Sequence, residues 1–247
     1  MTKPSLPNVT LVCADCIDTA RAIRVLEHCR NLCDFGAVKL LTSLETDYRD
    51  AVKIVHLGSL NDYSAFCLKE LHKYILTPFM LTVQHDGWIV NPEAWDQSWC
   101  DYDYIGPLYL QETHVNLWSV GSGGFSFRST RFMAAVARVL PPWDGSASYD
   151  NPSDGKNYWS HEDGVVTKHL RHYLEGAGFH YAPPLVAGRF AYGGNPNMQY
   201  YCPKPFGFHG FYACDRLAGG PGDGHSPYLT PDELRYKLDI QCTTENK

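Results

Sequence analysis

The chain lacks the sequence motifs of several common nucleotide enzymes. No G-x-G-x-x-G follows the first strand-like segment, and no G-x-x-x-x-G-K-[ST] occurs anywhere in its 247 residues. These absences argue against dinucleotide-dependent enzymes and P-loop phosphotransferases. A nucleotide, if one binds, is therefore held by other means.

The chain also has no basic cluster and no long apolar run. It carries 21 Lys and Arg against 27 Asp and Glu, a net charge of −6. A dedicated DNA-binding surface is therefore not expected. No apolar segment approaches the length of a membrane span, and the first residues do not have the form of a signal peptide. We expect a cytoplasmic protein.

The nine cysteines do not have the spacing of a zinc site. Cys13 and Cys16 form a C-x-x-C pair and Cys29 and Cys33 a C-x-x-x-C pair, but no second pair follows at zinc-finger distance. Their apolar neighbours are typical of small buried side chains, and an odd count fits reduced thiols. A zinc site or a redox pair is the weaker interpretation.

What the chain does contain is an alternation of strand and helix patterns in its first ninety residues or so. These patterns predict strands over 9–14, 37–41, 52–57 and 78–83, and helices over 15–32 and 63–75. Strands joined by helical crossovers form a parallel sheet. We therefore expect an α/β fold with a mostly parallel central sheet and a Rossmann-like nucleotide-binding half over about 9–90.

The second half, about 91–215, is expected to supply the acceptor and catalytic side of the same domain. Its patterns predict a short helix from Pro92, entry into a strand over 101–106, and helices over 130–140 and 162–174. The stretch 141–159 predicts a mobile loop, and 216–247 a polar C-terminal tail. No repeat or linker divides the chain, so 1–247 is expected to form a single domain.

The strand-like run 78–83 stops abruptly at Gln84-His85-Asp86-Gly87. Such a junction places the carboxylate at the carboxyl end of a buried strand, where open α/β sheets bind their ligands. A carboxylate there suits a hard divalent cation, Mn²⁺ or Mg²⁺, that would hold the phosphates of a nucleotide. The alternative is that Asp86 caps a turn, with Gly87 at a positive φ.

Two other strands of the predicted sheet end at the same edge. The first exits at Ala14-Asp15 and the second at Thr42-Ser43. We expect both exits, together with Gln84 and His85, to contact the nucleotide. Asp15 has a structural alternative, because an Asp directly before a helix can cap it.

The loop 121–124, with the sequence G-S-G-G, has two interpretations. Accessible backbone N–H groups in such a loop can cradle a phosphate, or the loop is a tight turn with a bulge before a strand. Phe125 or Phe127 would lie beneath a flat ligand such as a sugar ring. Gly123 and Gly124 are therefore candidates for contact with the donor sugar or the acceptor.

Glu162 and Asp163 open a predicted helix, and His209 lies in a late aromatic segment. The macrodipole favours two carboxylates in a first helical turn, so capping alone explains the pair. The functional alternative makes one of them a general base that accepts a proton from an attacking hydroxyl. A structural role is the ordinary interpretation of His209, although imidazole also binds manganese-like ions.

Taken in order, four segments resemble a GT-A-type glycosyltransferase, and in particular the glycosyltransferase family catalogued as a domain of unknown function (DUF5672). That family shows a strand ending in Q-x-D-G, a D-Y-D-Y-I-G segment, a G-G-F-S-x-R-S loop and an E-D pair before a helix. Here these segments stand at 84–87, 101–106, 123–129 and 162–163. The resemblance covers roughly residues 9–210 and implies a GT-A-like fold.

The resemblance also implies a divalent metal, held on the diphosphate of a nucleotide-sugar by a D-x-D-type motif and a late histidine. Only Asp86 matches the metal-binding acid cleanly, because Gln84 occupies the first acidic position. Gly207-Phe208-His209 matches the late ligand position of some inverting members, which makes His209 the second expected ligand. The acid pair lies where inverting enzymes keep their base, and Asp163 is favoured over Glu162.

The expected function is transfer of a hexose or pentose from a nucleotide-sugar to an acceptor hydroxyl, with inversion. A glycan, a small hydroxylated metabolite and a modified nucleobase all stay open as acceptors. Because of Gln84, a catalytically idle nucleotide-sugar or carbohydrate-binding module is the alternative. A nucleotidyltransferase is a third interpretation, and it would require a second metal-binding carboxylate beside Asp86.

Overall fold

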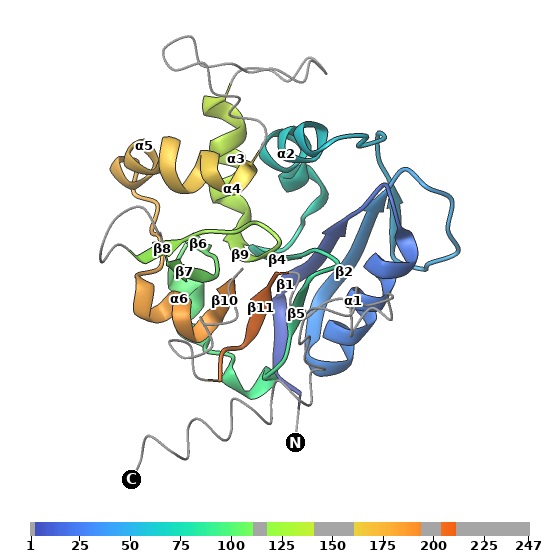
Figure 1. The fold of residues 1–247 in the computed structure, drawn as a ribbon, viewed down its shortest axis with the longest axis horizontal. Coiled ribbons are helices and arrows are strands. Elements are labelled where there is room, and N and C mark those ends of the chain that lie inside the picture. The colour runs from blue at the N-terminus through green and yellow to red at the C-terminus, as the bar shows by residue number, and fades with distance from the viewer. Residues whose placement is uncertain (1–2, 111–117, 141–160, 194–203, 211–247) are drawn as a thin grey trace, which may run out of the picture.

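A computed structural model of the chain describes residues 3–110, 118–140, 161–193 and 204–210 (Figure 1). The loop predicted over 141–159 and the tail predicted over 216–247 lie outside the described residues. No helix in the described part is long and apolar enough to cross a membrane.

The main sheet has six strands in the order β3-β2-β1-β4-β9-β6. They are β1 (Ser5–Ala14), β2 (Asp34–Thr42), β3 (Ala51–Lys53), β4 (Phe79–Val83), β6 (Tyr104–Ile105) and β9 (Phe125–Ser129). The first four in spatial order run parallel, and β9 is antiparallel to both of its neighbours. The expected α/β class with a mostly parallel central sheet is confirmed.

Helices cover both faces of this sheet. Because side chains alternate along a strand, Leu11 and Leu81 lie in a core with α1 (Thr19–Leu32). Val12 and Met80 point to the other face and lie in a second core with α2 (Leu60–Lys69) and α3 (Thr130–Val139). Figure 1 shows α2 and α3 at the top and α1 at the lower right. A 3-10 turn, η1 (Leu71–Tyr74), follows α2.

The first helix begins later than its apolar pattern predicts. The Asp18 side chain caps α1 by accepting hydrogen bonds from the N–H groups of Ala20 (3.0 Å) and Arg21 (3.2 Å). Asp15 instead accepts from the N–H groups of Ile17 (2.7 Å) and Asp18 (2.9 Å) in the preceding turn. The chain therefore leaves β1 through a short polar turn before the helix starts.

The cysteines of the described residues behave as small apolar side chains. Cys13, Cys16, Cys29, Cys33 and Cys67 are all buried and free. Burial raises the pKa of Cys29 and of Cys67 to about 12. Thiols with so little thiolate character are unreactive at neutral pH.

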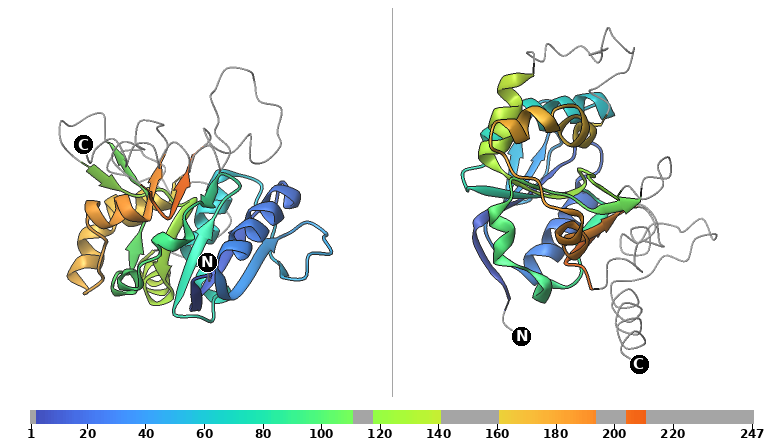
Figure 2. Two further views of the ribbon diagram at one scale, coloured as in Figure 1. Left: turned by 90° about the horizontal axis from the view of Figure 1, so that it is seen from below. Right: turned by 90° about the vertical axis from the view of Figure 1, so that its left-hand side faces the viewer.

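A second sheet lies beside the first, in the order β5-β11-β10-β7-β8. Its strands are β5 (Gly87–Ile89), β7 (Leu108–Leu110), β8 (Trp118–Val120), β10 (Ala191–Gly193) and β11 (Gly207–His209). In both views of Figure 2 the orange segments, α6 (Pro184–Phe190), β10 and β11, lie next to the green strands β7 and β8. The chain enters this sheet directly after β4, through the turn that contains Asp86.

The remaining elements are short. Two 3-10 turns, η2 (Pro92–Ala94) and η3 (Gln97–Asp101), follow β5. The helix predicted over 162–174 is three consecutive pieces: α4 (Glu162–Gly164), the π-helical turn η5 (Val165–His169) and α5 (Arg171–Gly176). Apolar periodicity predicted the helical segment but not its π turn.

Aromatic rings join the two sheets in one hydrophobic core. Trp99 has its ring centroid 5.3 Å from that of Phe190 and 5.6 Å from that of Phe206. Phe125 of β9 lies 5.2 Å from Phe190 by the same measure. Since Phe206 directly precedes β11, this packing holds β11 against the edge of the main sheet where β4 ends.

Candidate active site

Asp86 lies in the tight turn that carries the chain from β4 in the main sheet to β5 in the second sheet. Gly87 N–H closes the turn by donating to the Gln84 carbonyl (2.9 Å). Gly87 does not adopt a left-handed φ, but a Cβ at this position would overlap the Gly124 carbonyl, so the turn requires its small size. Asp86 is only 3% exposed. A buried carboxylate thus stands at the carboxyl end of β4.

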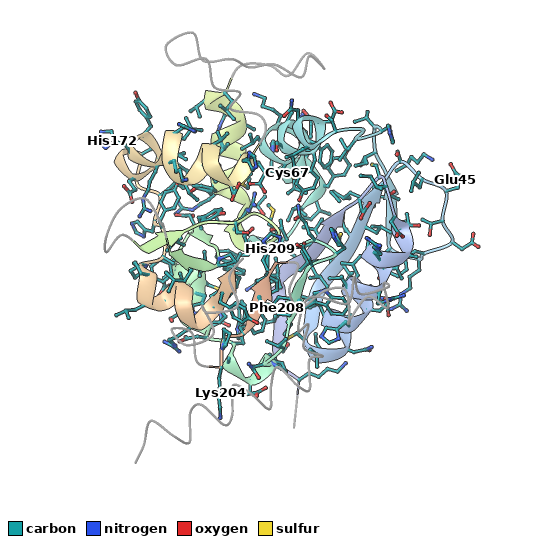
Figure 3. The ribbon with its side chains drawn as sticks, in the orientation of Figure 1. Glu45, Cys67, His172, Lys204, Phe208 and His209 are labelled. Atoms are coloured by element: carbon teal, nitrogen blue, oxygen red, sulfur yellow. The ribbon has the colours of Figure 1, made fainter. Side chains whose placement is uncertain are left out.

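His209, at the end of β11, lies near the centre of the molecule in Figure 3, and its ring is within ion-pair distance of Asp86. β11 runs antiparallel to β5, which sets His209 opposite Gly87. The imidazole Nε2 lies 3.2 Å from Asp86 Oδ1 and 3.3 Å from Gln84 Oε1. The structure therefore brings together the two expected metal ligands and the glutamine that replaces an acid.

Burial and the histidine have opposite effects on Asp86. Burial raises the pKa of a carboxyl group, but the hydrogen bond and charge of His209, with the charge of His85, hold the pKa of Asp86 below its ordinary value. Apart from the ion-pair contact with His209, the buried Oδ1 has no hydrogen-bond partner in the described residues. Asp86 is therefore an ionised carboxylate whose Oδ1 atom can still accept a hydrogen bond.

These groups fit a divalent cation. Adjacent ligands of an octahedral ion with bonds of ~2.1 Å lie ~3.0 Å apart, close to the 3.2 and 3.3 Å measured here. A Cβ at Gly124 would overlap both His209 Nε2 and Gln84 Oε1, so the glycine allows the loop to pack directly against them. Three or more His, Cys, Asp and Glu side chains do not gather at any point of the described chain. A third protein ligand would therefore be the Gln84 amide oxygen.

Gln84 is anchored through both its backbone and its side chain. Its N–H donates to the Gly124 carbonyl (2.8 Å). Its amide group lies close to Tyr63 of α2, which is also a neighbour of Cys67. Burial raises the pKa of Tyr63 well above its ordinary value, so this hydroxyl stays neutral. The amide Oε1 is directed toward His209.

Ser122 joins His209 to the acid pair. Its hydroxyl hydrogen-bonds to His209 Nδ1, and its backbone N–H donates to Asp163 Oδ2 (2.9 Å). Asp163 is half-buried at the start of α4. One of the two predicted acids therefore lies beside the loop that contacts the histidine.

Glu162, the other acid, lies in a buried ion pair. Arg128 Nη2 is 2.7 Å from Glu162 Oε1, and the two side chains are 0% and 5% exposed. Burial raises the pKa of Glu162, and its Oε2 has no hydrogen-bond partner among the described residues. A Cβ at Gly123 would overlap this carboxylate, so the ion pair is packed directly against the glycine loop. Glu162 is placed to support the loop from beneath.

A cavity of 340 Å³ opens next to Gln84, between the exit of β1 and the start of α2. Ala14 and Asp15, Gln84 and His85 are among the residues that line it. These are four of the residues expected to contact the nucleotide. The cavity therefore adjoins the Asp86–His209 pair through Gln84.

Thr42 and Ser43 lie outside the lining of this cavity. The buried Thr42 hydroxyl accepts a hydrogen bond from Leu44 N–H (3.1 Å). The Ser43 hydroxyl pairs with His56 Nδ1 (2.9 Å). Contact of these two side chains with a nucleoside stays a prediction.

Sequence reasoning gave no individual role to Ser122, Arg128 or Tyr63. For Arg128 a signal existed, since an Arg inside the apolar strand F-S-F-R-S must be buried with a compensating acid. For Ser122 and Tyr63 there was none, because their contacts join segments that are distant in sequence.

The sequence matches a family model described as a protein of unknown function (DUF5672) over residues 49–209. No curated protein matches it.

Solved structures give distant likenesses only. A glycosyltransferase involved in the glycosylation of the major capsid of PBCV-1 is 12% identical, with a TM-score of 0.46 over 94% of this chain and 98% of that one. The bifunctional IspDF from Campylobacter jejuni is 9% identical, with a TM-score of 0.42 over 71% of this chain and 48% of that one. A197 from STIV is 11% identical, with a TM-score of 0.34 over 70% and 80% of the two chains. At such scores the likenesses say nothing of this chain's activity.

Proposed function

This chain belongs to the DUF5672 family of proteins of unknown function, as its motifs indicated, and from its site we propose that it is a glycosyltransferase. In this proposal it moves a sugar from a nucleotide-sugar donor to an acceptor hydroxyl. The carrying observation is the convergence of Asp86, Gln84 and His209 beside a cavity at the carboxyl edge of a parallel sheet. Ligands of open α/β sheets bind at this edge.

Asp86 and His209, with the Gln84 amide oxygen, would hold a divalent cation such as Mn²⁺ or Mg²⁺. Carboxylate and amide oxygens are hard ligands that suit such ions, and imidazole is compatible with manganese. When bound, the ion would supply positive charge that neutralises the donor diphosphate and stabilises it as a leaving group. The residues lining the cavity, Ala14, Asp15 and His85 among them, would position the nucleoside.

Asp163 is the proposed general base. It is half-buried and lies beside the loop 121–124, where Gly123 and Gly124 would face the donor sugar or the acceptor. In a single displacement the acceptor oxygen bonds to the anomeric carbon, its proton passes to Asp163, and the bond from that carbon to the diphosphate breaks. This sequence inverts the anomeric configuration.

Glu162 fits a supporting role better than a catalytic one. Its Oε1 is engaged by Arg128 at 2.7 Å, and the carboxylate is buried under Gly123. A base must reach a proton on the substrate. The proposal therefore assigns proton transfer to Asp163 and keeps Glu162 as a support of the loop.

A panel of nucleotide-sugars tests the proposal. Thermal shift with and without Mn²⁺ identifies a donor, because a ligand that binds only the folded state raises the melting temperature. Hydrolysis of that donor, and its transfer to glycans, small hydroxylated metabolites or nucleosides, is then followed by mass spectrometry.

Transfer of a sugar from one donor to an acceptor would support the proposal that this chain is a glycosyltransferase. Binding without hydrolysis or transfer would favour the alternative, an idle nucleotide-sugar or carbohydrate-binding module, for which the amide at Gln84 is the motivating observation. Absence of any nucleotide-sugar binding would overturn both.

A further inference from the structure

We propose that Ser122 is a positioning residue that orients the imidazole of His209 for metal binding and holds Asp163 beside it. This inference deepens the proposed function and rests on its metal site. Two hydrogen bonds carry it: the Ser122 hydroxyl to His209 Nδ1, and Ser122 N–H to Asp163 Oδ2 at 2.9 Å. One residue thus contacts both the expected late metal ligand and the expected base.

The backbone at Ser122 is strained in a way that its neighbours are not. Its φ is +69°, a left-handed conformation that favours glycine. Gly121, Gly123 and Gly124 surround it, yet none of these glycines has a positive φ. The strained position of a loop otherwise made of glycine is therefore the one that carries a side chain. Strain of this kind is typical of functional sites.

The hydroxyl suits His209 because it can both donate and accept a hydrogen bond. Without a cation, Nε2 lies near two acceptors, Asp86 Oδ1 at 3.2 Å and Gln84 Oε1 at 3.3 Å. When only Nε2 carries a proton, it donates to Gln84 Oε1, and the Ser122 hydroxyl donates to Nδ1. With a cation, Nε2 offers its lone pair to the metal, and Nδ1–H donates to the same hydroxyl. Ser122 keeps the ring in place in both tautomers.

Metal-binding histidines are commonly oriented through their second ring nitrogen, and removing such a partner lowers metal affinity about 10–100-fold. Carboxylate or carbonyl partners accept only and favour Nδ1–H. A hydroxyl has no such bias. The Ser122 side chain therefore permits cation binding and release without rotation of the ring.

The variant Ser122→Gly separates the hydroxyl from the rest of the loop. Glycine adopts a positive φ without strain and retains the N–H that donates to Asp163, so only the contact with His209 is lost. The control is Ser43→Gly, which removes a similar hydroxyl from His56 Nδ1 at the end of β2. Both variants are measured without nucleotide, by Mn²⁺ titration calorimetry and by ¹⁵N NMR of the histidine rings in the metal-free protein.

Ser122→Gly is expected to shift the His209 Nδ1 resonance toward that of an unbonded nitrogen and to weaken Mn²⁺ binding about 10–100-fold. Ser43→Gly should shift His56 and leave His209 and Mn²⁺ affinity unchanged. An unaltered His209 resonance and an Mn²⁺ affinity within twofold of wild type in Ser122→Gly would overturn the proposal. If the wild-type protein binds no Mn²⁺, the metal part of the proposed function fails, and the His209 resonance still decides whether Ser122 orients the ring.

Discussion

Asp86 provides a buried, ionised carboxylate beside the cavity, and replacing it tests the binding of a cation. Asp86→Ala should abolish transfer and weaken the Mn²⁺-dependent binding of a nucleoside diphosphate, because the diphosphate loses its metal bridge. Titration calorimetry with and without Mn²⁺ measures the effect. Asp34→Ala is the control. It removes an exposed carboxylate at the amino end of β2, away from the carboxyl ends of the strands where the site lies. Unchanged nucleotide affinity in Asp86→Ala would exclude this residue from the site.

Asp163 is half-buried, and its Oδ2 accepts a hydrogen bond from Ser122 N–H. Asp163→Asn should lower turnover by about 10²–10⁴-fold, the usual contribution of a general base, and leave donor affinity nearly intact. Enzyme kinetics and the anomeric configuration of the product by proton NMR are the measurements. Retention of configuration would rule out a single displacement. Near-native turnover of the variant would move the role away from Asp163.

Ser129 caps the start of α3 and also contacts the buried Asp103. The Ser129 hydroxyl accepts from Phe132 N–H (3.1 Å) and donates to the buried Asp103 Oδ1 (2.6 Å). Ser129→Ala should lower the free energy of unfolding by about 2–4 kcal/mol, because the cap is lost and a buried acceptor is left unpaired.

A matched cap exists at α2, where the exposed Ser59 hydroxyl accepts from Asp62 N–H (3.1 Å). Ser59→Ala should cost about 1 kcal/mol or less, since water can replace the lost partner. Urea unfolding of both variants gives the comparison. Equal losses would show that burial of Asp103 adds nothing to the cap of α3.

The elements of the first half were largely predictable, because apolar runs and amphipathic periods are local. In that half the strand before Gln84 matches its predicted position within a residue or so, as α3 does in the second half. The third strand was predicted too long: β3 ends at Lys53, although Ile54 and Leu57 are buried as their apolar character indicates. Burial alone does not require strand pairing, and β3 pairs with β2 over three residues.

The candidate site was predictable only as separate parts. Asp86 was selected by its residue type and its position after a strand, and the resemblance to the glycosyltransferase family added His209 as a metal ligand and Asp163, rather than Glu162, as the base. The contacts that relate them, from Ser122 to His209 and from Arg128 to Glu162, depend on how the second sheet and α4 pack against the first. No local sequence pattern carries that information. The structure was therefore needed to show that Glu162 is buried and Asp163 is half-buried.

The stability of the whole molecule should depend on the ionisation of Asp86. Its pKa is lower in the folded protein than in the unfolded chain, where an Asp titrates near ~3.9. The ionised group therefore stabilises the fold above about pH 4, and this contribution is lost as the pH falls through the lower folded pKa.

Comparison with Asp86→Asn isolates this effect. The difference in unfolding free energy between wild type and variant should shrink as the pH falls below about pH 4. Urea denaturation at a series of pH values provides the measurement. A difference that grows on acidification would mean that the folded pKa is raised.

The place of β11 in the chain also orders events during synthesis. His209 meets Gln84 across 125 positions, and β11 is the final strand of the described residues. Because a ribosome makes the chain from its N-terminus and folding begins there, all strands of the main sheet emerge before residues 207–209 do. A nascent chain thus acquires Asp86 and Asp163 long before it acquires the imidazole. The last of the proposed cation ligands is therefore made only after the sheet that supports the site has been synthesised.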